Sequence, residues 1–237
     1  MNHRIAAIIT AAGSSSRMGG VKKEYRPLPG QFDDAGRPLT VLGAAVLAFA
    51  AVPRIERIVI AVPASGEYGE AAARASLPEG CLAPNAAPIC FVPGGATRRS
   101  SVYQALAVLA DYNPGYVLIH DGARPWVDRD LIERTIDAVI AHDAVVPLLP
   151  LTETPKEIDG SGFVQRHLKR AQIGGAQTPQ GFAYPDILRA HEQAAVREAA
   201  GVDYTDDAEV WGEFRGAVAV IAGSPANRKI TFPEDMP

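Results

Sequence analysis

Apolar runs typical of buried strands recur along the 237-residue chain, and stretches with helical spacing separate them. The runs are IAAIIT (5–10), RIVIAVP (57–63), ICFVP (89–93), YVLIH (116–120) and AVVPLLPL (144–151). Helical spacing occurs between them at 40–51, about 66–76, 99–110 and 128–142. Strands that are apolar throughout and alternate with helices indicate a parallel sheet covered on both faces. The sequence therefore predicts an α/β fold with a doubly wound, mainly parallel sheet.

The first run continues into TAAGSSSRMGGVKKEY, a loop of small residues with several cations. Ligands of doubly wound sheets bind beyond the carboxyl ends of the strands, which is where this loop begins. Its glycines match neither the P-loop nor the dinucleotide-binding pattern. Ala11, Ala12 and Gly13 leave room for a flat ring against the backbone, and Arg17 and Lys23 follow at a reach suited to a polyphosphate. A solvated loop with surface charges is the alternative.

Two further polar motifs follow apolar runs, GGATRRSS after ICFVP and HDGARP after YVLIH. A carboxylate at Asp121 suits a divalent ion or a ribose, and Arg124 suits a second phosphate, although a structural ion pair is equally compatible. His120 is typical of a structural residue at a strand end. The glycines of GGATRRSS would let a base or ribose lie against the backbone, or they form a simple strand-to-helix turn. Lys229, taken alone, would be a surface residue.

The alternation of strands and helices fails between about 152 and 182. This segment is polar and contains the turn signal DGSG, so we expect a protruding β-hairpin arm with little capacity to form a core. Such a hairpin is marginally stable alone and needs a surface to lie against. Helical spacing returns at 184–199 and 205–214, and AVAVIAG (217–223) is typical of a late strand.

Composition excludes several classes of protein. A hydrophobic content of 47% with 21% charged residues is ordinary for a globular protein, and the length suits one domain. No apolar run approaches the ~20 residues of a membrane helix, and a net charge of −4 argues against a broad nucleic-acid surface. Cys81 and Cys90 have no metal-binding spacing, which favours a reduced, cytoplasmic protein, with a disulfide as the alternative. No histidine has a paired nucleophile, so we do not expect covalent catalysis.

In order along the chain, TAAGSSSRMGGVKKEY, GGATRRSSV, HDGARP, ETPK, R-x7-TPQGF, TDD and NRKIT-x-PED resemble the 2-C-methyl-D-erythritol 4-phosphate cytidylyltransferase family. Each motif is weak alone, but the ordered combination over about 5–235 is specific. The resemblance implies a Rossmann-like nucleotidyltransferase domain over 1–237, with a dimerisation arm at about 152–182. It implies conversion of CTP and 2-C-methyl-D-erythritol 4-phosphate to 4-diphosphocytidyl-2-C-methyl-D-erythritol and pyrophosphate, in non-mevalonate isoprenoid biosynthesis. Because no second domain follows residue 237, we expect no fusion to the pathway's cyclase.

The resemblance also implies roles for individual residues. The cytosine and ribose of CTP would be held by Ala11, Ala12, Gly13, Gly95 and Ser101. Catalysis would fall to Arg17, Lys23 and Lys229, the first two holding the triphosphate. Asp121 would contact the nucleotide and provide the direct ligand of a Mg²⁺ cofactor. The methylerythritol phosphate would be bound by Arg124, Thr154, Arg170 and Thr178, the last two from the arm of the neighbouring subunit in a homodimer.

The chain departs from the family pattern at a few positions. Glu24 follows the catalytic lysine, where the family usually has glutamine. Ala96 stands where relatives often have an acidic residue, and 30–39 is longer than the family's short turn, which suggests a surface excursion. Pro225 and Ala226 lack a carboxylate that some relatives carry there, which leaves Asp121 as the direct metal ligand.

Two other functions remain as alternatives. Ribitol-5-phosphate cytidylyltransferase shares the fold and most of the site, but it tends to carry a β-branched residue where Ala123 stands. A nucleotide-binding regulatory module without turnover is a different class of protein. The simultaneous presence of Arg17, Lys23, Asp121 and Lys229 argues against that class.

Overall fold

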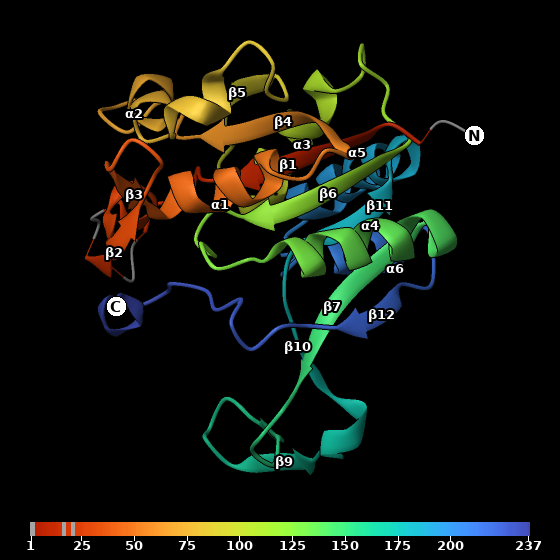
Figure 1. Ribbon diagram of the computed structural model, residues 1–237. Coiled ribbons are helices and arrows are strands. Elements are labelled where there is room, and N and C mark those ends of the chain that lie inside the picture. The colour runs from red at the N-terminus through yellow and green to blue at the C-terminus, as the bar shows by residue number, and fades with distance from the viewer. Residues whose placement is uncertain (1–2, 16–17, 20–21) are drawn as a thin grey trace.

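The computed structural model describes residues 3–15, 18–19 and 22–237, and a single large sheet forms its centre (Figure 1). Within these residues the sheet has eight strands, in the order β10-β7-β11-β6-β1-β4-β5 with β12 beside β7. The strands are β1 (Ile5–Thr10), β4 (Ile55–Val62), β5 (Ile89–Pro93), β6 (Tyr116–Asp121), β7 (Ala144–Pro150), β10 (Gly174–Ala176), β11 (Gln180–Ala183) and β12 (Ala219–Ala222). The neighbours β5, β4, β1 and β6 are parallel, whereas β11 is antiparallel to β6 and β7. The predicted mainly parallel sheet is confirmed, and β10 and β11 make it a mixed one.

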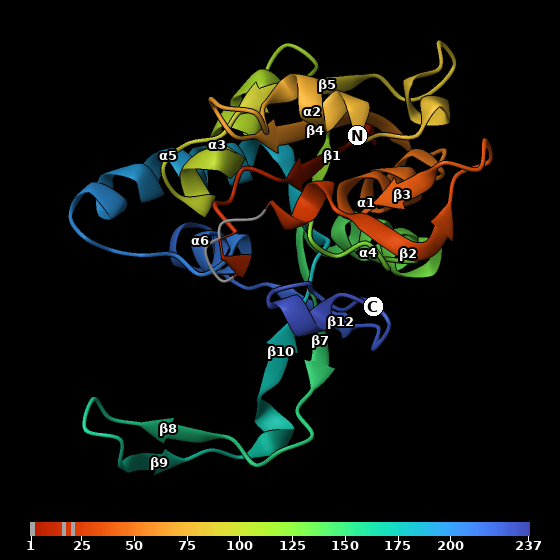
Figure 2. The same ribbon diagram turned by 90° about the vertical axis from the view of Figure 1, so that its left-hand side faces the viewer.

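Helices cover both faces of this sheet (Figure 2). They are α1 (Val41–Ala50), α2 (Glu70–Ala75), α3 (Arg98–Val108), α4 (Arg129–His142), α5 (Tyr184–Ala199) and α6 (Asp207–Phe214). The side chains of β1 alternate between two cores, as the pleat of a strand requires. Ile5, Ala7 and Ile9 pack with α1 and α4, while Ala6 and Ile8 pack with α3, α5 and α6. The central strands β1 and β6 are therefore buried on both sides, whereas β5 is only partly buried, and the doubly wound arrangement is confirmed.

Two helices begin close to strand ends that carry the motifs. The segment after β5 leads into α3, where Thr97 accepts a hydrogen bond from Ser100 N–H. The segment after β6 leads into α4, where Asp128 accepts one from Leu131 N–H. These caps satisfy backbone donors that a helix start leaves without a partner. Short 3₁₀ helices complete the chain at η2 (Lys23–Tyr25), η3 (Glu79–Leu82), η4 (Arg170–Gln172) and η5 (Pro233–Asp235).

Two hairpins lie outside the main sheet. They are β2 (Pro27–Phe32) with β3 (Pro38–Thr40), and β8 (Lys156–Ile158) with β9 (Val164–His167). The first hairpin contains residues 30–39, the segment expected to extend beyond the family's short turn. The second is the predicted arm, and the ends of β7 and β10 carry it away from the body (Figure 2). The protruding part is shorter than the predicted 152–182, because β10 pairs with β7 and β11 returns to the central sheet.

None of the helices in the described ranges is both long and apolar enough to cross a membrane. Cys81 is buried and Cys90 is half-buried, and neither takes part in a disulfide. The core between the sheet and its helices is instead held by apolar packing.

Phe182 in β11 tests that packing, because its side chain is fully buried and its ring centroid lies 5.7 Å from that of Trp211. Phe182→Ala should lower the free energy of unfolding by about 3–5 kcal/mol, since it removes a large buried ring and leaves a cavity. Phe32→Ala is the matched control: Phe32 is 59% exposed, so its loss should change stability by no more than ~0.5 kcal/mol. Urea denaturation of both variants measures the difference, and equal losses would contradict the assigned core.

Candidate active site

A cavity of about 450 Å³ opens beyond the carboxyl ends of β1, β5 and β6. Segments far apart in the sequence line it: the opening loop at 12–15, residues 95–98 at the start of α3, and Asp121 at the end of β6. Lys23 and Lys229 also line it. Parallel strands present their carboxyl ends at one edge of the sheet, so the loops that follow them meet there. The structure thus gathers the opening loop, GGATRRSS, HDGARP and NRKIT around one space.

The opening loop and the segment after β5 approach each other so closely that a glycine is required. A Cβ on Gly94 would lie 2.2 Å from the Cβ of Ala12, far closer than two non-bonded carbon atoms can approach. The next residue, Gly95, donates its N–H to Ser101 Oγ at 3.1 Å, and that hydroxyl donates to Thr97 O at 2.8 Å. Ser101 therefore holds the backbone of Gly95 beside the cavity. This geometry suits the binding of a flat ring against the main chain.

Asp121 is the centre of charge in the cavity. Lys229 Nζ lies 2.9 Å from its Oδ2, Arg124 Nε lies 3.4 Å from the same oxygen, and Arg98 Nη2 lies 3.6 Å from Oδ1. Burial alone would raise the pKa of Asp121, but the three neighbouring cations outweigh burial and hold this pKa well below its usual range. The carboxylate is therefore ionised at neutral pH, and the cluster carries a net positive charge.

His120 and Thr178 support Asp121 from behind. Asp121 N–H donates to Thr178 Oγ1 at 3.0 Å, and Thr178 Oγ1 lies 3.0 Å from His120 Nδ1. The other ring nitrogen, Nε2, lies 3.1 Å from Arg124 O. The network is satisfied when Thr178 donates to Nδ1 and Nε2 donates to the carbonyl, which requires a neutral ring. Burial lowers the pKa of His120 to about 4, in agreement with that neutral state.

Thr178 is therefore placed differently from its predicted position in the arm. It is buried in the body of its own chain, directly behind Asp121. Asn227 Nδ2 donates to Thr178 O at 2.7 Å, which ties this residue to the NRKIT segment as well. The physical reason is that β11 begins just afterwards and pairs with β6, so the chain has already rejoined the sheet.

Lys23 extends towards the cavity, and its ammonium donates to Ile230 O at 2.6 Å. The N–H of Ile230 in turn donates to Ala123 O at 2.9 Å, so this contact is tied to HDGARP. Lys23 and Lys229 therefore come from opposite ends of the sequence and line one cavity. Arg17, the other cation predicted for the triphosphate, lies outside the described residues.

Three comparisons with known proteins bear on this geometry. The family model described as IspD, 2-C-methyl-D-erythritol 4-phosphate cytidylyltransferase, matches residues 5–237. This chain belongs to that family. Its motifs and the cavity they surround are thus features of an IspD chain, and the predicted family is confirmed.

Relatives of two lengths match. A bifunctional IspD/IspF enzyme of Mesorhizobium japonicum is 36% identical, with 98% of this chain and 53% of the relative covered. A 2-C-methyl-D-erythritol 4-phosphate cytidylyltransferase of Prochlorococcus marinus is 38% identical, with 97% of this chain and 93% of the relative covered. The chain therefore spans about half the length of the bifunctional relatives it matches, and nearly all of the shorter one.

Solved IspD structures share the fold. The 4-diphosphocytidyl-2C-methyl-D-erythritol synthase of Anaerococcus prevotii has a TM-score of 0.79 at 29% identity, covering 98% of this chain and 92% of its own. The Francisella tularensis IspD has a TM-score of 0.75 at 27% identity, covering 98% and 96%. The Rossmann-like nucleotidyltransferase fold predicted for the chain is confirmed.

Arg98 is a charged residue of the cavity for which sequence reasoning predicted no role. Its guanidinium lies 2.8 Å from Asp207 Oδ2 and also faces Asp121, so it links the start of α6 to the cavity. GGATRRSS contains two adjacent arginines, and no local sequence pattern predicts which of them faces the cavity. Arg99 turns away and pairs with Glu198 at 2.7 Å. The fold decides between the two arginines, because it places the buried carboxylate of Asp207 beside Arg98.

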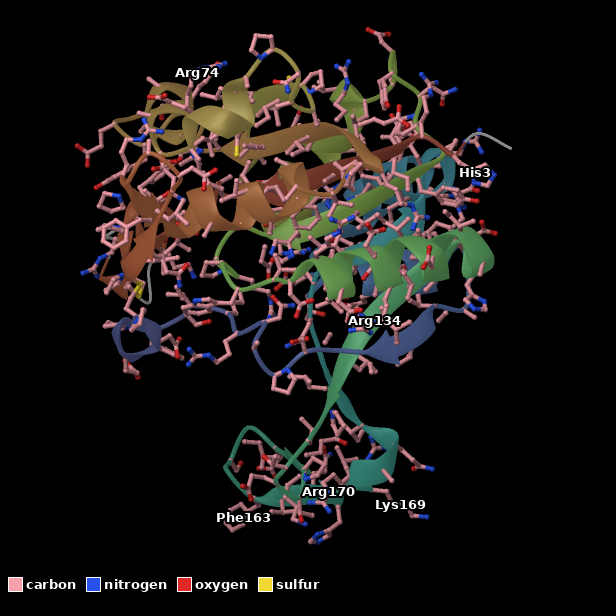
Figure 3. The ribbon with its side chains drawn as sticks, in the orientation of Figure 1. His3, Arg74, Arg134, Phe163, Lys169 and Arg170 are labelled. Atoms are coloured by element: carbon pink, nitrogen blue, oxygen red, sulfur yellow. The ribbon has the colours of Figure 1, made fainter. Side chains whose placement is uncertain are left out.

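The residues predicted for the methylerythritol phosphate are divided between two places in this chain: Arg124 and Thr178 contact Asp121, whereas Thr154 and Arg170 lie away from the cavity. Arg124 is buried and donates to Asn227 O at 2.8 Å. Thr154 and Arg170 belong to the arm, and Figure 3 shows Arg170 there, away from the body. Its guanidinium donates to Thr152 O at 2.6 Å within the same arm. Among the described residues that line the cavity, neither Thr154 nor Arg170 is included.

The residues that line the cavity suit a magnesium ion only if substrate phosphates provide some of its ligands. In the described part of the chain, no group of three or more histidine, cysteine, aspartate or glutamate side chains is arranged to hold a metal. Asp121 does offer a carboxylate to the cavity. Magnesium keeps several waters and is commonly held by one or two carboxylates together with substrate phosphates. A single carboxylate at this position is compatible with that mode of binding.

The neutral state of His120 predicts a loss of stability in acid. Its pKa is about 4 in the fold against 6.5 in the unfolded chain, so its contribution is complete above pH 6.5 and disappears as the pH falls towards 4. Between pH 7 and pH 5 this amounts to about 2 kcal/mol of unfolding free energy.

Urea denaturation at the two pH values measures this loss. His120→Gln removes the titrating group, so its stability should fall less between pH 7 and pH 5 than that of the wild type. His142→Gln, at the exposed end of α4, should behave like the wild type. A pH dependence that His120→Gln leaves unchanged would contradict the buried neutral ring.

Proposed function

We propose that this chain transfers the cytidylyl group of CTP to the phosphate of 2-C-methyl-D-erythritol 4-phosphate and releases pyrophosphate. The observation that carries the proposal is the cluster of cations around Asp121 in the cavity of an IspD-family chain. Such a cavity attracts anions, and both substrates are polyanions. The Prochlorococcus marinus relative named for this activity matches along 93% of its length, which supports the same assignment.

The chemistry requires positioning and charge neutralisation more than proton transfer. The attacking group is a phosphate oxygen already ionised near pH 7, so no general base is needed. It attacks the α-phosphorus of CTP in line with the departing pyrophosphate, and negative charge grows on the equatorial and leaving oxygens. Lys23 and Lys229 line the cavity and are suited to stabilise this charge. Arg17 is assigned the same role on its sequence position.

The nucleoside is assigned to backbone segments that line the cavity. The segment at 12–13 and Gly95 present main chain to the space, and Ser101 keeps Gly95 in place. Backbone N–H and C=O groups at fixed positions can distinguish one base from another by their pattern of donors and acceptors. We therefore assign cytosine and ribose to Ala12, Gly13, Gly95 and Ser101, which line the cavity. Ala11, predicted for the same role, is instead buried, and its carbonyl accepts a hydrogen bond from Lys22, so it supports the loop from within the protein.

We also propose Mg²⁺ as the cofactor, with Asp121 as its ligand from the protein. When bound, the ion would act as a Lewis acid and neutralise part of the negative charge of the phosphates. The chain's own cations keep Asp121 ionised, which a metal ligand requires. Arg124 and Lys229 both lie against Oδ2 of this carboxylate, and we assign the sugar phosphate to their neighbourhood.

A pyrophosphate-release assay tests this function. With CTP and Mg²⁺, 2-C-methyl-D-erythritol 4-phosphate should support rapid release, and ribitol 5-phosphate should support little. Lys23→Ala should lower kcat by about a hundredfold or more, because the transition state loses a charged donor. Preferential turnover of ribitol 5-phosphate would identify the alternative enzyme, and CTP binding without release would identify a non-catalytic module. Unchanged kcat in a folded Lys23→Ala protein would remove Lys23 from the catalytic residues.

We further propose that the protein is a homodimer in which each arm completes the site of its partner. The arm exposes apolar side chains, with Phe163 73%, Ile158 65% and Val164 50% exposed, and Figure 3 shows Phe163 at the outer edge of the arm. Exposed apolar residues on a hairpin with no core of its own favour a second protein surface. Arg170 shares this arm, and a two-fold axis would bring it to the partner's cavity.

Subunit mixing distinguishes a shared site from an internal one. Lys23→Ala and Arg170→Ala should each be nearly inactive. In a mixed dimer of the two, one site lacks both residues and the other is intact. Random reassortment makes half the dimers mixed, so about a quarter of wild-type activity should return. If Arg170 serves its own subunit, every mixed site lacks one residue and mixing restores nothing.

A cytoplasmic location is also proposed. Two free cysteines are typical of a protein from a reducing compartment. Activity of the reduced protein in the pyrophosphate-release assay is compatible with this location.

A further inference from the structure

Lys22 and Lys23 are neighbours in the sequence, but their side chains occupy different surroundings. Lys23 lines the cavity, whereas Lys22 is only 4% exposed and is not among the described residues that line the cavity. The ammonium of Lys22 donates to Ala11 O at 2.6 Å and also to Gly13 O. These carbonyls belong to the part of the loop that leaves β1. Lys22 thus joins two carbonyls of the opening loop from behind.

Glu24 extends this connection to the far side of the loop. It is also only 4% exposed, and its Oε2 lies 3.4 Å from Lys22 Nζ. The same oxygen accepts a hydrogen bond from Ser15 Oγ at 3.1 Å. A continuous set of polar contacts therefore runs from Ala11 and Gly13 through Lys22 and Glu24 to Ser15.

We propose that Lys22 and Glu24 are positioning residues, which together form a clamp that holds the opening loop at 11–15 in the conformation that receives the nucleotide. The inference rests on the proposed function for the identity of that nucleotide, CTP. Neither residue is assigned a contact with the reacting atoms. They act on the substrate through the backbone of the loop.

The composition of the loop explains why a clamp is useful. Glycine and serine lose much conformational freedom on ordering, so a loop built from them is costly to fix when a ligand binds. Ser15 also has a φ of 52°, in the left-handed region that a residue with a side chain seldom adopts. A loop that is already ordered before binding avoids that cost at the moment of binding.

Charge gives Lys22 a second effect. Glu24 borders the cavity, and an unpaired carboxylate there would repel the phosphates of CTP. Lys22 neutralises this carboxylate. Burial lowers the pKa of Lys22, while the negative charge of Glu24 acts to raise it. A buried pair of this kind adds little net stability, and such pairs can instead select one conformation.

Three variants separate the clamp from a contribution to stability alone. Lys22→Met removes the ammonium at similar length and leaves Glu24 unpaired. Glu24→Gln removes the carboxylate charge and keeps an oxygen that accepts from Ser15. The double variant removes both charges, so the buried unpaired carboxylate is gone, but the two loop carbonyls still lack their donor. Arg54→Met is the matched control, because Arg54 pairs with Glu133 and Asp137 outside the cavity.

Steady-state kinetics and thermal unfolding give the first readout. Lys22→Met should raise KM for CTP by about tenfold or more, the effect of losing charge-assisted hydrogen bonds, with KM for the polyol phosphate changed less than about twofold. Glu24→Gln should raise KM for CTP by about threefold. The double variant should regain thermal stability relative to Lys22→Met, yet keep a raised KM for CTP. Arg54→Met should leave both KM values unchanged.

Hydrogen exchange without substrate gives a second readout that does not depend on the reaction. Amides of the loop at 11–15 should exchange faster in the double variant than in the wild type, and at the wild-type rate in Arg54→Met. If KM for CTP in the double variant returns to the wild-type value along with stability, or if loop exchange is unchanged, the clamp is wrong. A wild type that releases no pyrophosphate would overturn the proposed function, while faster loop exchange would still support the clamp.

Discussion

A single buried carboxylate, surrounded by cations, organises this protein. Asp121 ends β6 and pairs with Lys229, Arg124 and Arg98, which come from three different parts of the chain. A carboxylate so deep in the protein is costly unless it is paired, and the cations are in turn held by it. The cluster thereby keeps an excess of positive charge at one place. A cavity prepared in this way suits the binding of two phosphorylated substrates.

The rest of the fold can be understood as support for this cluster. Three parallel strands end beside the cavity, and the helices on both faces bury β1 and β6 almost completely and β5 in part. Behind Asp121, both ring nitrogens of the neutral His120 are hydrogen-bonded, Nδ1 to Thr178 and Nε2 to the carbonyl of Arg124. Thr178 in turn accepts a hydrogen bond from the N–H of Asp121 and so fixes its backbone. Gly94 has no Cβ, which allows the segment after β5 to contact the opening loop at Ala12. Stability and site geometry therefore depend on the same contacts.

Two features of the chain are incomplete within one subunit. The arm carries Arg170 and exposed apolar side chains but has no core, and the cavity lacks the arm residues assigned to the sugar phosphate. In a symmetric dimer, an arm that lies against the partner subunit would both cover its apolar side chains and bring Arg170 to the partner's cavity. The opening loop is the opposite case, because Lys22 and Glu24 of the same chain already hold it.

The sequence by itself determined the parallel strands β1, β4, β5 and β6, the strands β7 and β12, the two-sided covering of the sheet and the motifs beside the cavity, because apolar periodicity and strand ends are local properties. It did not determine β10 and β11, whose short runs lie inside the segment predicted as an arm and are recognised as strands only by their pairing with β7 and β6. It also predicted a structural role for His120. The tertiary structure alone decided which partner each charged residue takes. Arg98 and Arg99 are adjacent and look alike, yet one faces Asp121 and the other pairs with Glu198. Lys22 and Lys23 diverge in the same way, and Thr178 is buried behind Asp121 instead of lying on the arm. Pairing of charges depends on distances between residues far apart in the chain, and only the folded chain sets those distances.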